Sequence, residues 1–133
     1  MFIENVSLAA IQRGEHFIPG CNAMLIQIVD PDMEFPIPKY EFKETHQFKF
    51  LDIEDNDDLA IQSDQALEIA KLLVKAKNNC MNVIVHCHAG ICRSGAVAEC
   101  GVIIGFDDTE VYRQPNLRVK RMVISHLFDM NAI

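Results

Sequence analysis

The segment from 86 to 95 gathers a thiol, a guanidinium and a hydroxyl within ten residues. It reads His-Cys-His-Ala-Gly-Ile-Cys-Arg-Ser-Gly. Five residues separate Cys87 from Arg93, and Ser94 follows the arginine directly. An apolar run precedes the segment at 83–85, and a helix-compatible stretch follows it. This pattern predicts a loop between a strand and a helix that binds phosphate and carries a nucleophile.

Successive backbone N–H groups at the N-terminus of a helix bind phosphate well, because the helix dipole adds a favourable field. Gly90 permits a backbone conformation that a residue with a Cβ atom resists. Arg93 can place a planar, bidentate fork on two phosphate oxygens. The residues predicted to bind substrate are therefore His88, Ala89, Gly90, Ile91, Cys92 and Arg93.

The same field favours the thiolate of Cys87, which is then poised to attack phosphorus. Ser94 can donate a hydrogen bond to the sulfur and make it a better leaving group. His86 is expected to order the loop by hydrogen bonding to the backbone rather than to act as a base. The alternative is a buried cysteine at a strand end and a surface arginine, which the combined spacing of Gly90, Arg93 and Ser94 disfavours.

At these residues the chain resembles the cysteine-dependent protein tyrosine phosphatase superfamily, whose signature is His-Cys-x5-Arg-Ser/Thr. The loop looks most like that of the dual-specificity branch, His-Cys-x-Ala-Gly-x-x-Arg-Ser. The resemblance implies that Cys87 is the nucleophile, that Arg93 and the loop amides bind phosphate, and that Ser94 assists hydrolysis of the cysteinyl-phosphate intermediate. Asn116, in the pair Pro-Asn at 115–116, resembles a pair that many dual-specificity phosphatases carry before their last helix.

Cleavage of a phosphate ester also needs a proton donor for the departing oxygen. The acidic loop 54–58 is the obvious source. In the similar enzymes an aspartate lies just past a strand, about thirty residues before the nucleophile. Asp55 lies 32 positions before Cys87 and Asp57 lies 30. Because 51–55 also resembles the family's hydrophobic-x-hydrophobic-x-Asp ending, Asp55 is chosen as the general acid over Asp57.

A second cysteine, Cys92, stands inside the loop. The string Cys-x4-Cys-Arg-Ser is similar to that of the low-molecular-weight phosphatases, in which a second loop cysteine can pair with the nucleophile. A nearby thiol can trap an oxidised cysteine as a reversible disulfide. Cys92 is therefore a possible redox partner of Cys87, and the alternative is that it fills space as a serine would.

Other functions use related features. A rhodanese-type sulfurtransferase also carries a loop cysteine, but those loops are generally shorter. A phosphoresidue-binding pseudoenzyme is disfavoured by the presence of Cys87, Arg93 and an acidic loop. RNA 5′-phosphate and phosphoinositide remain as alternative substrates to phosphotyrosine, phosphoserine or phosphothreonine in proteins. The contiguous trio 86–88 cannot converge on one metal ion, so neither metal nor cofactor is expected.

The composition of the chain indicates its cellular compartment and its class of partner. The formal charge of -7 argues against a nucleic-acid or anionic-membrane partner,. The five cysteines are an odd number, no secretory signal is recognisable, and no apolar run is long enough to span a bilayer,. We therefore expect a cytoplasmic monomer whose partner is a phosphorylated protein or peptide. Its 133 residues are expected to form a single phosphatase domain,.

Strands and helices alternate along the chain. A buried strand is predicted at 23–29 and further strands at 48–53 and 81–85, and the strand at 48–53 is expected to lie beside the strand at 83–85. The predicted fold is α/β, a central and mostly parallel sheet of about four or five strands flanked by helices, as in the protein tyrosine phosphatases. Helices are predicted at 7–13, 64–78 with Ser63 as N-cap, 93–105, 107–113, and after an Asn116 cap.

Overall fold

Five parallel strands form the centre of the molecule. The computed structural model describes all residues from Met1 to Ile133. Every strand pairing is parallel, which confirms the predicted α/β architecture. The sheet order is β3-β2-β4-β1-β5, and the strands are β1 (Phe2–Ser7), β2 (Ala23–Val29), β3 (Glu44–Lys49), β4 (Asn82–Cys87) and β5 (Asp107–Asp108).

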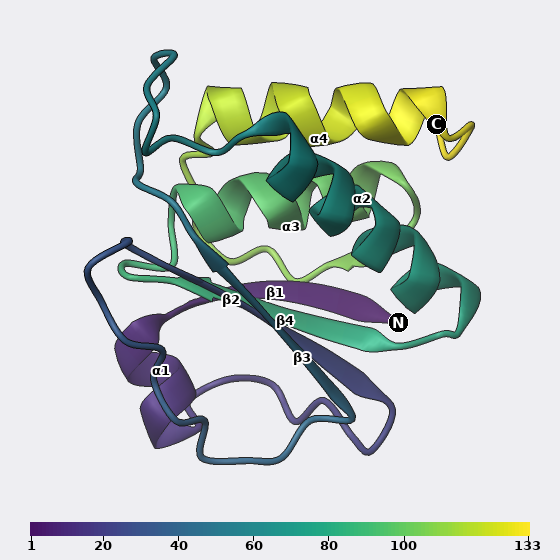
Figure 1. Ribbon diagram of the computed structural model, residues 1–133. Helices are drawn as coiled ribbons and strands as arrows, with labels where there is room; N and C mark the ends of the chain where they lie inside the picture. The colour runs from purple at the N-terminus through teal and green to yellow at the C-terminus, as the bar shows by residue number, and fades with distance from the viewer.

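Four helices cover the two faces of the sheet unequally. Three of them lie together on one face and α1 lies alone on the other (Figure 1). The larger core cluster, of 26 buried residues, lies between the sheet and the three-helix layer. No helix is long and apolar enough to cross a bilayer. The helices are α1 (Leu8–Arg13), α2 (Ser63–Asn78), α3 (Arg93–Ile103) and α4 (Leu117–Asp129).

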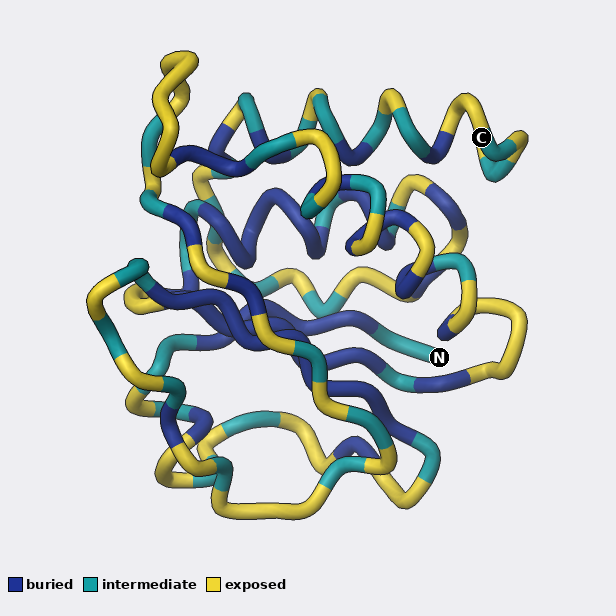
Figure 2. Tube along the Cα trace, viewed as in Figure 1, coloured by how far each residue is buried: buried dark blue, intermediate teal, exposed yellow.

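The two central strands were predictable because both of their faces are covered. All seven residues of β2 are buried, and five of the six in β4 are. Strands buried on both faces are near-continuous apolar runs, a pattern that stands out in a sequence. Figure 2 shows the resulting dark, buried sheet between exposed loops. The buried strand predicted at 23–29 is therefore confirmed, and the one predicted at 81–85 is confirmed with its end moved to Cys87.

The strand predicted at 48–53 is misplaced. The strand β3 ends at Lys49, and its residues alternate between exposed and half-buried or buried because it is an edge strand. The expectation that it lies beside the strand at 83–85 is wrong, since β2 separates β3 from β4. Phe50 lies just past the strand and is buried, so the apolar residues there belong to a loop that packs on the core.

The first strand, β1, has no counterpart in the predictions because it contains buried polar residues. Glu4 and Asn5 are 5% and 1% exposed. Their partners are distant in sequence: Phe17 donates its backbone N–H to Glu4 Oε1 (3.0 Å), and Asn5 Nδ2 donates to the Gly90 carbonyl (2.7 Å). Local patterns cannot reveal such partners.

Two further expectations are corrected. The segment 107–113 is not helical: Asp107 and Asp108 pair with β1, and Glu110 adopts a left-handed conformation with φ of 60°. The N-cap of α2 is Gln62 rather than Ser63. The Ser63 hydroxyl instead lies 3.0 Å from Nε2 of His126 in α4, so a contact between helices replaces the expected cap.

Candidate active site

The predicted phosphate loop connects the end of β4 to the start of α3. Cys87 is the last residue of the strand, and Arg93 and Ser94 form the first turn of the helix. In α/β sheets, the carboxyl ends of parallel strands are the usual place for ligands. The segment between strand and helix is therefore the five residues 88–92, at the N-terminus of α3.

Four carbonyl groups of this loop accept hydrogen bonds from residues outside it. The His88 carbonyl accepts from Leu8 N–H (3.1 Å), and the Gly90 carbonyl from the side chain of Asn5 (2.7 Å). Backbone N–H groups of residues 114 and 116 donate to the carbonyls of residues 91 and 92, at 3.2 and 3.0 Å. By contrast, the N–H groups of 88–92 have no acceptor within the protein. Such unpaired donors are what an anion requires.

The backbone at Gly90 requires glycine. Its φ is 75°, and a Cβ atom there would lie 2.4 Å from the Ser7 nitrogen and 2.4 Å from the carbonyl carbon of Val6. Both atoms belong to the backbone of β1, so the loop rests directly on that strand. A side chain at this position would push the loop away from its support.

Arg93 is buried, and half of its guanidinium is already occupied. Its Nη1 donates to Asp30 Oδ1 and to the Phe50 carbonyl, both at 2.7 Å. Its Nε is buried and has no partner. The edge formed by Nε and Nη2 is therefore left for a ligand, and a pair of phosphate oxygens matches that edge.

The thiol of Cys87 lies at the bottom of this loop. Its Sγ is 3.1 Å from Ser94 Oγ, the contact that the spacing predicts. Behind it, His86 Nδ1 lies 3.3 Å from the Cys87 carbonyl oxygen. Burial lowers the pKa of His86 to about 4, and the Arg93 charge acts in the same direction. His86 is thus neutral near pH 7 and contacts the backbone of Cys87.

A cavity of about 300 Å³ opens above the thiol. Of the predicted substrate-binding residues, Gly90 and Ile91 do not line it. They line a different cavity on the outer side of the loop, where Ile91 lies with Ser7 and Tyr112. Ile91 therefore does not line the cavity above the thiol, so its predicted part in substrate binding is left to its backbone N–H. The cavity is lined by Cys87, His88, Ala89, Cys92 and Arg93 from the loop side, and by Asp30, Leu51, Asp52 and Ile53 from the facing side.

The acidic loop faces the same region. Asp55 is exposed and lines an adjoining cavity of about 500 Å³, which shares Asp52, Ile53 and Cys92 with the first. Asp57 does not line either cavity, and its Oδ1 accepts from the Leu59 backbone N–H (2.9 Å). The loop projects from the molecule as an exposed segment (Figure 2). Of the two aspartates considered as general acid, only Asp55 lines a cavity next to the predicted phosphate loop.

We compared the chain with known protein families, curated proteins and solved structures. No family profile and no curated protein matches the chain. Human DUSP28 superposes with a TM-score of 0.64 at 13% identity, over 98% of this chain and 94% of its own. A mouse putative dual specificity phosphatase, solved with zinc tungstate, gives 0.63 at 14% identity, over 95% and 84%. The chain has the fold of the dual-specificity phosphatases.

A viral protein extends the comparison. OH1 from the Orf virus, a tyrosine phosphatase with triple substrate specificity, superposes with a TM-score of 0.51 at 19% identity. The match covers 77% of this chain but only 55% of the viral protein, so the chain spans about half of that relative. The predicted resemblance to the dual-specificity phosphatase fold is confirmed by these structures.

Asn116, predicted from its Pro-Asn pair, connects three parts of this dual-specificity phosphatase fold. Its Oδ1 accepts from Val119 N–H (3.0 Å) and caps α4, as expected. Its Nδ2 donates to Asp52 Oδ1 (2.8 Å) and to the Ile53 carbonyl (3.2 Å). Its own N–H donates to Cys92 in the phosphate loop. Asn116 thus joins the last helix, the acidic loop and the phosphate loop.

Two aspartates of the site, Asp30 and Asp52, were missed by sequence reasoning. Asp30 directly follows β2 and orients Arg93, and Asp52 lines both cavities. The signal that could have revealed Asp30 is its position at the carboxyl end of a buried strand. Asp52 was taken for the interior of a strand, which hid its role as a cavity residue.

Cys92 lies against Asp52. Burial raises the pKa of the Cys92 thiol, and the Asp52 carboxylate raises it further through its negative charge and a hydrogen bond. The thiol form is therefore favoured at neutral pH. Cys92 also lines the cavity with Cys87, so the two loop cysteines share one cleft.

Proposed function

We propose that this protein is a phosphomonoester hydrolase of the tyrosine or dual-specificity phosphatase type. The observation that carries the proposal is the set of unpaired N–H groups at 88–92 and Arg93 Nε around the Cys87 thiol. These donors match the oxygens of a phosphate, and the thiol lies beneath the position of its phosphorus. The fold supports the same conclusion.

In the first step, the Cys87 thiolate attacks phosphorus and forms an S–P bond as the P–O bond to the leaving group breaks. Asp55 gives its proton to the departing oxygen. In the second step, Asp55 takes a proton from water, whose oxygen attacks phosphorus and displaces the sulfur. Ser94 stabilises the departing thiolate through its 3.1 Å contact with Sγ.

The substrate that this cleft favours is a single phosphate on a protein or peptide. Arg93 is the only arginine or lysine among the residues that line the cavity, while Asp30 and Asp52 are both present. A substrate with several phosphates would meet repulsion from these carboxylates. Phosphoinositides and RNA 5′-phosphates are therefore the less favoured alternatives.

The first test is hydrolysis of para-nitrophenyl phosphate and its inhibition by vanadate. We expect turnover that vanadate suppresses, because vanadate occupies the same amide cradle as phosphate. A profile over phosphotyrosine, phosphothreonine, phosphoinositide and RNA 5′-phosphate substrates then assigns the substrate class. Vanadate binding without turnover of any substrate would indicate a phosphoresidue-binding pseudoenzyme instead, and thiosulfate sulfurtransferase activity would indicate the rhodanese alternative.

We further propose that Cys92 protects Cys87 during oxidation. Peroxide converts the Cys87 thiolate to a sulfenic acid and is itself reduced to hydroxide. The Cys92 sulfur then attacks the oxidised sulfur, an S–S bond forms, and the hydroxyl group leaves with the Cys92 proton as water. The shared cavity brings the two sulfurs to one cleft, and Asp52, which is hydrogen-bonded to the Cys92 thiol, is placed to pass that proton to the departing hydroxyl group.

Peroxide treatment followed by mass spectrometry without reduction should detect a Cys87–Cys92 linked peptide. Cys92→Ser should instead accumulate the sulfinic and sulfonic forms of Cys87, which thiol reductants do not reverse. Cys100 is a built-in control, since burial raises the pKa of its thiol to about 12 and keeps it unreactive. Absence of the 87–92 link in the wild-type protein would end the redox hypothesis.

A further inference from the structure

The direction in which the backbone N–H groups of the loop point depends on the hydrogen bonds that its carbonyl groups accept. A peptide group is planar and trans, so its C=O and N–H point in opposite directions. A donor that fixes the Gly90 carbonyl outward therefore turns the Ile91 N–H inward, toward the anion position. Of the external donors to carbonyls of 88–92, three are backbone N–H groups and one is a side chain, that of Asn5.

Asn5 is buried in β1, with an exposed fraction of 1%. Its Nδ2 donates to the Gly90 carbonyl at 2.7 Å and to the Tyr112 carbonyl at 3.2 Å. Its Oδ1 is also buried but has no partner. A buried acceptor without a partner is unfavourable, so an apolar side chain would fill this space better. The two hydrogen bonds that Nδ2 donates therefore account for a buried amide side chain at this position.

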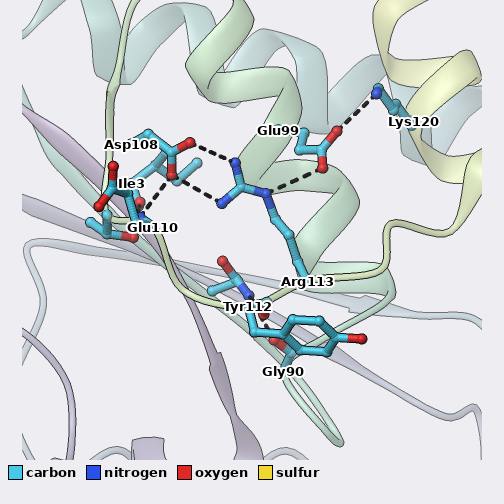
Figure 3. Close-up of polar contacts among 10 residues, drawn as sticks. Ile3, Gly90, Glu99, Asp108, Glu110, Tyr112, Arg113 and Lys120 are labelled. Carbon is cyan, nitrogen blue, oxygen red and sulfur yellow. Dashed lines mark hydrogen bonds and ion pairs between the residues drawn. The ribbon is translucent and has the colours of Figure 1, made fainter.

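The second acceptor belongs to a segment that is itself anchored. Arg113, next to Tyr112, donates to both oxygens of Asp108, at 3.1 and 3.0 Å, and to Glu99 at 3.3 Å. Lys120 of α4 holds the other oxygen of Glu99 at 2.8 Å. Figure 3 shows Arg113 reaching toward Asp108 and Glu99, while Tyr112 lies beside Gly90. The Asn5 amide thus joins the loop to a segment fixed on β5, α3 and α4.

We propose that Asn5 is a positioning residue that aims the Ile91 amide at the phosphate. The proposal rests on the proposed phosphatase function, because it names a residue that prepares the same anion site. Gly90 already rests on the backbone of β1, and the hydrogen bond from Asn5 sets the orientation of the peptide group that follows. Asn5 acts through the loop and does not touch the phosphate.

The test replaces Asn5 by aspartate, which keeps the shape of the side chain but removes both donors. Asn82→Asp is a matched control: Asn82 Nδ2 also donates to a carbonyl, that of Pro19 (3.0 Å), and its Oδ1 accepts from Phe2 N–H (2.9 Å), at the opposite end of the sheet. Binding of inorganic phosphate is measured by calorimetric titration, together with the KM and kcat for para-nitrophenyl phosphate and the unfolding temperature.

We expect Asn5→Asp to weaken phosphate binding and raise KM by roughly tenfold or more at pH 7, the worth of a hydrogen bond to a charged group. A protonated aspartic acid can donate one hydrogen bond to the Gly90 carbonyl. Binding should therefore recover in part as the pH falls to about 5, after correction for the same change in the wild-type protein. Asn82→Asp should lower the unfolding temperature while phosphate affinity stays within about twofold of the wild type.

The proposal is overturned if Asn5→Asp lowers the unfolding temperature but binds phosphate as the wild type does, or if both variants weaken binding equally. Asn5→Ser, which shortens the side chain without adding charge, is measured in parallel in case the aspartate variant does not fold. If the wild type binds phosphate but hydrolyses nothing, the proposed phosphatase function is wrong. The effect of Asn5→Asp on phosphate binding then still tests whether Asn5 positions the loop. If the wild type binds no phosphate, both the proposed phosphatase function and the positioning role of Asn5 are wrong.

Discussion

Replacing Cys87 by serine is expected to abolish turnover and leave phosphate binding intact. The thiol is 2% exposed and lies beneath the amides of 88–92, where it alone can attack a phosphorus that those amides hold. A serine hydroxyl at the same position has no neighbouring base, because His86 contacts the backbone rather than the nucleophile. We expect a loss of roughly 10⁴- to 10⁶-fold in kcat, as when a covalent nucleophile is removed from a hydrolase.

The measurement has two arms and one control. Acid-quenched wild-type protein should carry one phosphoryl group on Cys87 by mass spectrometry, and Cys87→Ser should carry none while still binding inorganic phosphate in titration. Cys80→Ser, the same substitution at an exposed cysteine outside both cavities, should behave as the wild type does. Turnover that survives in Cys87→Ser would remove the cysteine mechanism altogether.

Replacing Asp55 by asparagine should lower turnover by roughly 10²- to 10⁴-fold, the usual contribution of general acid–base catalysis. The loss should be largest for substrates with a poor leaving group, such as an alkyl phosphate. It should be smaller for para-nitrophenyl phosphate, whose leaving group needs less protonation. Asp55 is exposed and lines the cavity next to the one above the thiol, so its side chain is free to meet a bound ester.

The neighbouring aspartates make this prediction specific. Asp57→Asn removes an equal charge from the same loop, and its carboxylate serves a turn to Leu59, so we expect no more than a few-fold change,. Asp52 is held by Asn116 and lines both cavities, which makes it the alternative donor. A large loss in Asp57→Asn or Asp52→Asn, with Asp55→Asn unaffected, would show that the general acid is assigned to the wrong residue.

The chemistry of the site was readable from the sequence because it is local. Cys87, Gly90, Arg93 and Ser94 lie within one strand–loop–helix unit, where spacing along the chain determines spacing in the fold. The structure keeps their predicted relations, including the contact between Cys87 and Ser94 and the positive φ of Gly90. The central strands were predictable for a similar reason, since complete burial leaves an unbroken apolar pattern.

Residues that support the site from a distance were decided by the tertiary structure. Asp30 lies 63 positions from Arg93, and Asn5 lies 85 positions from Gly90. Such contacts depend on strand order and register, which periodicity does not encode. Because β2 lies next to β4, Asp30 at the end of β2 forms the ion pair with Arg93. The sequence by itself determined the loop that we propose to bind phosphate and the sulfur atom that we propose to attack it. Only the tertiary structure decided which side chains orient that loop, because those side chains meet it through the order of the strands.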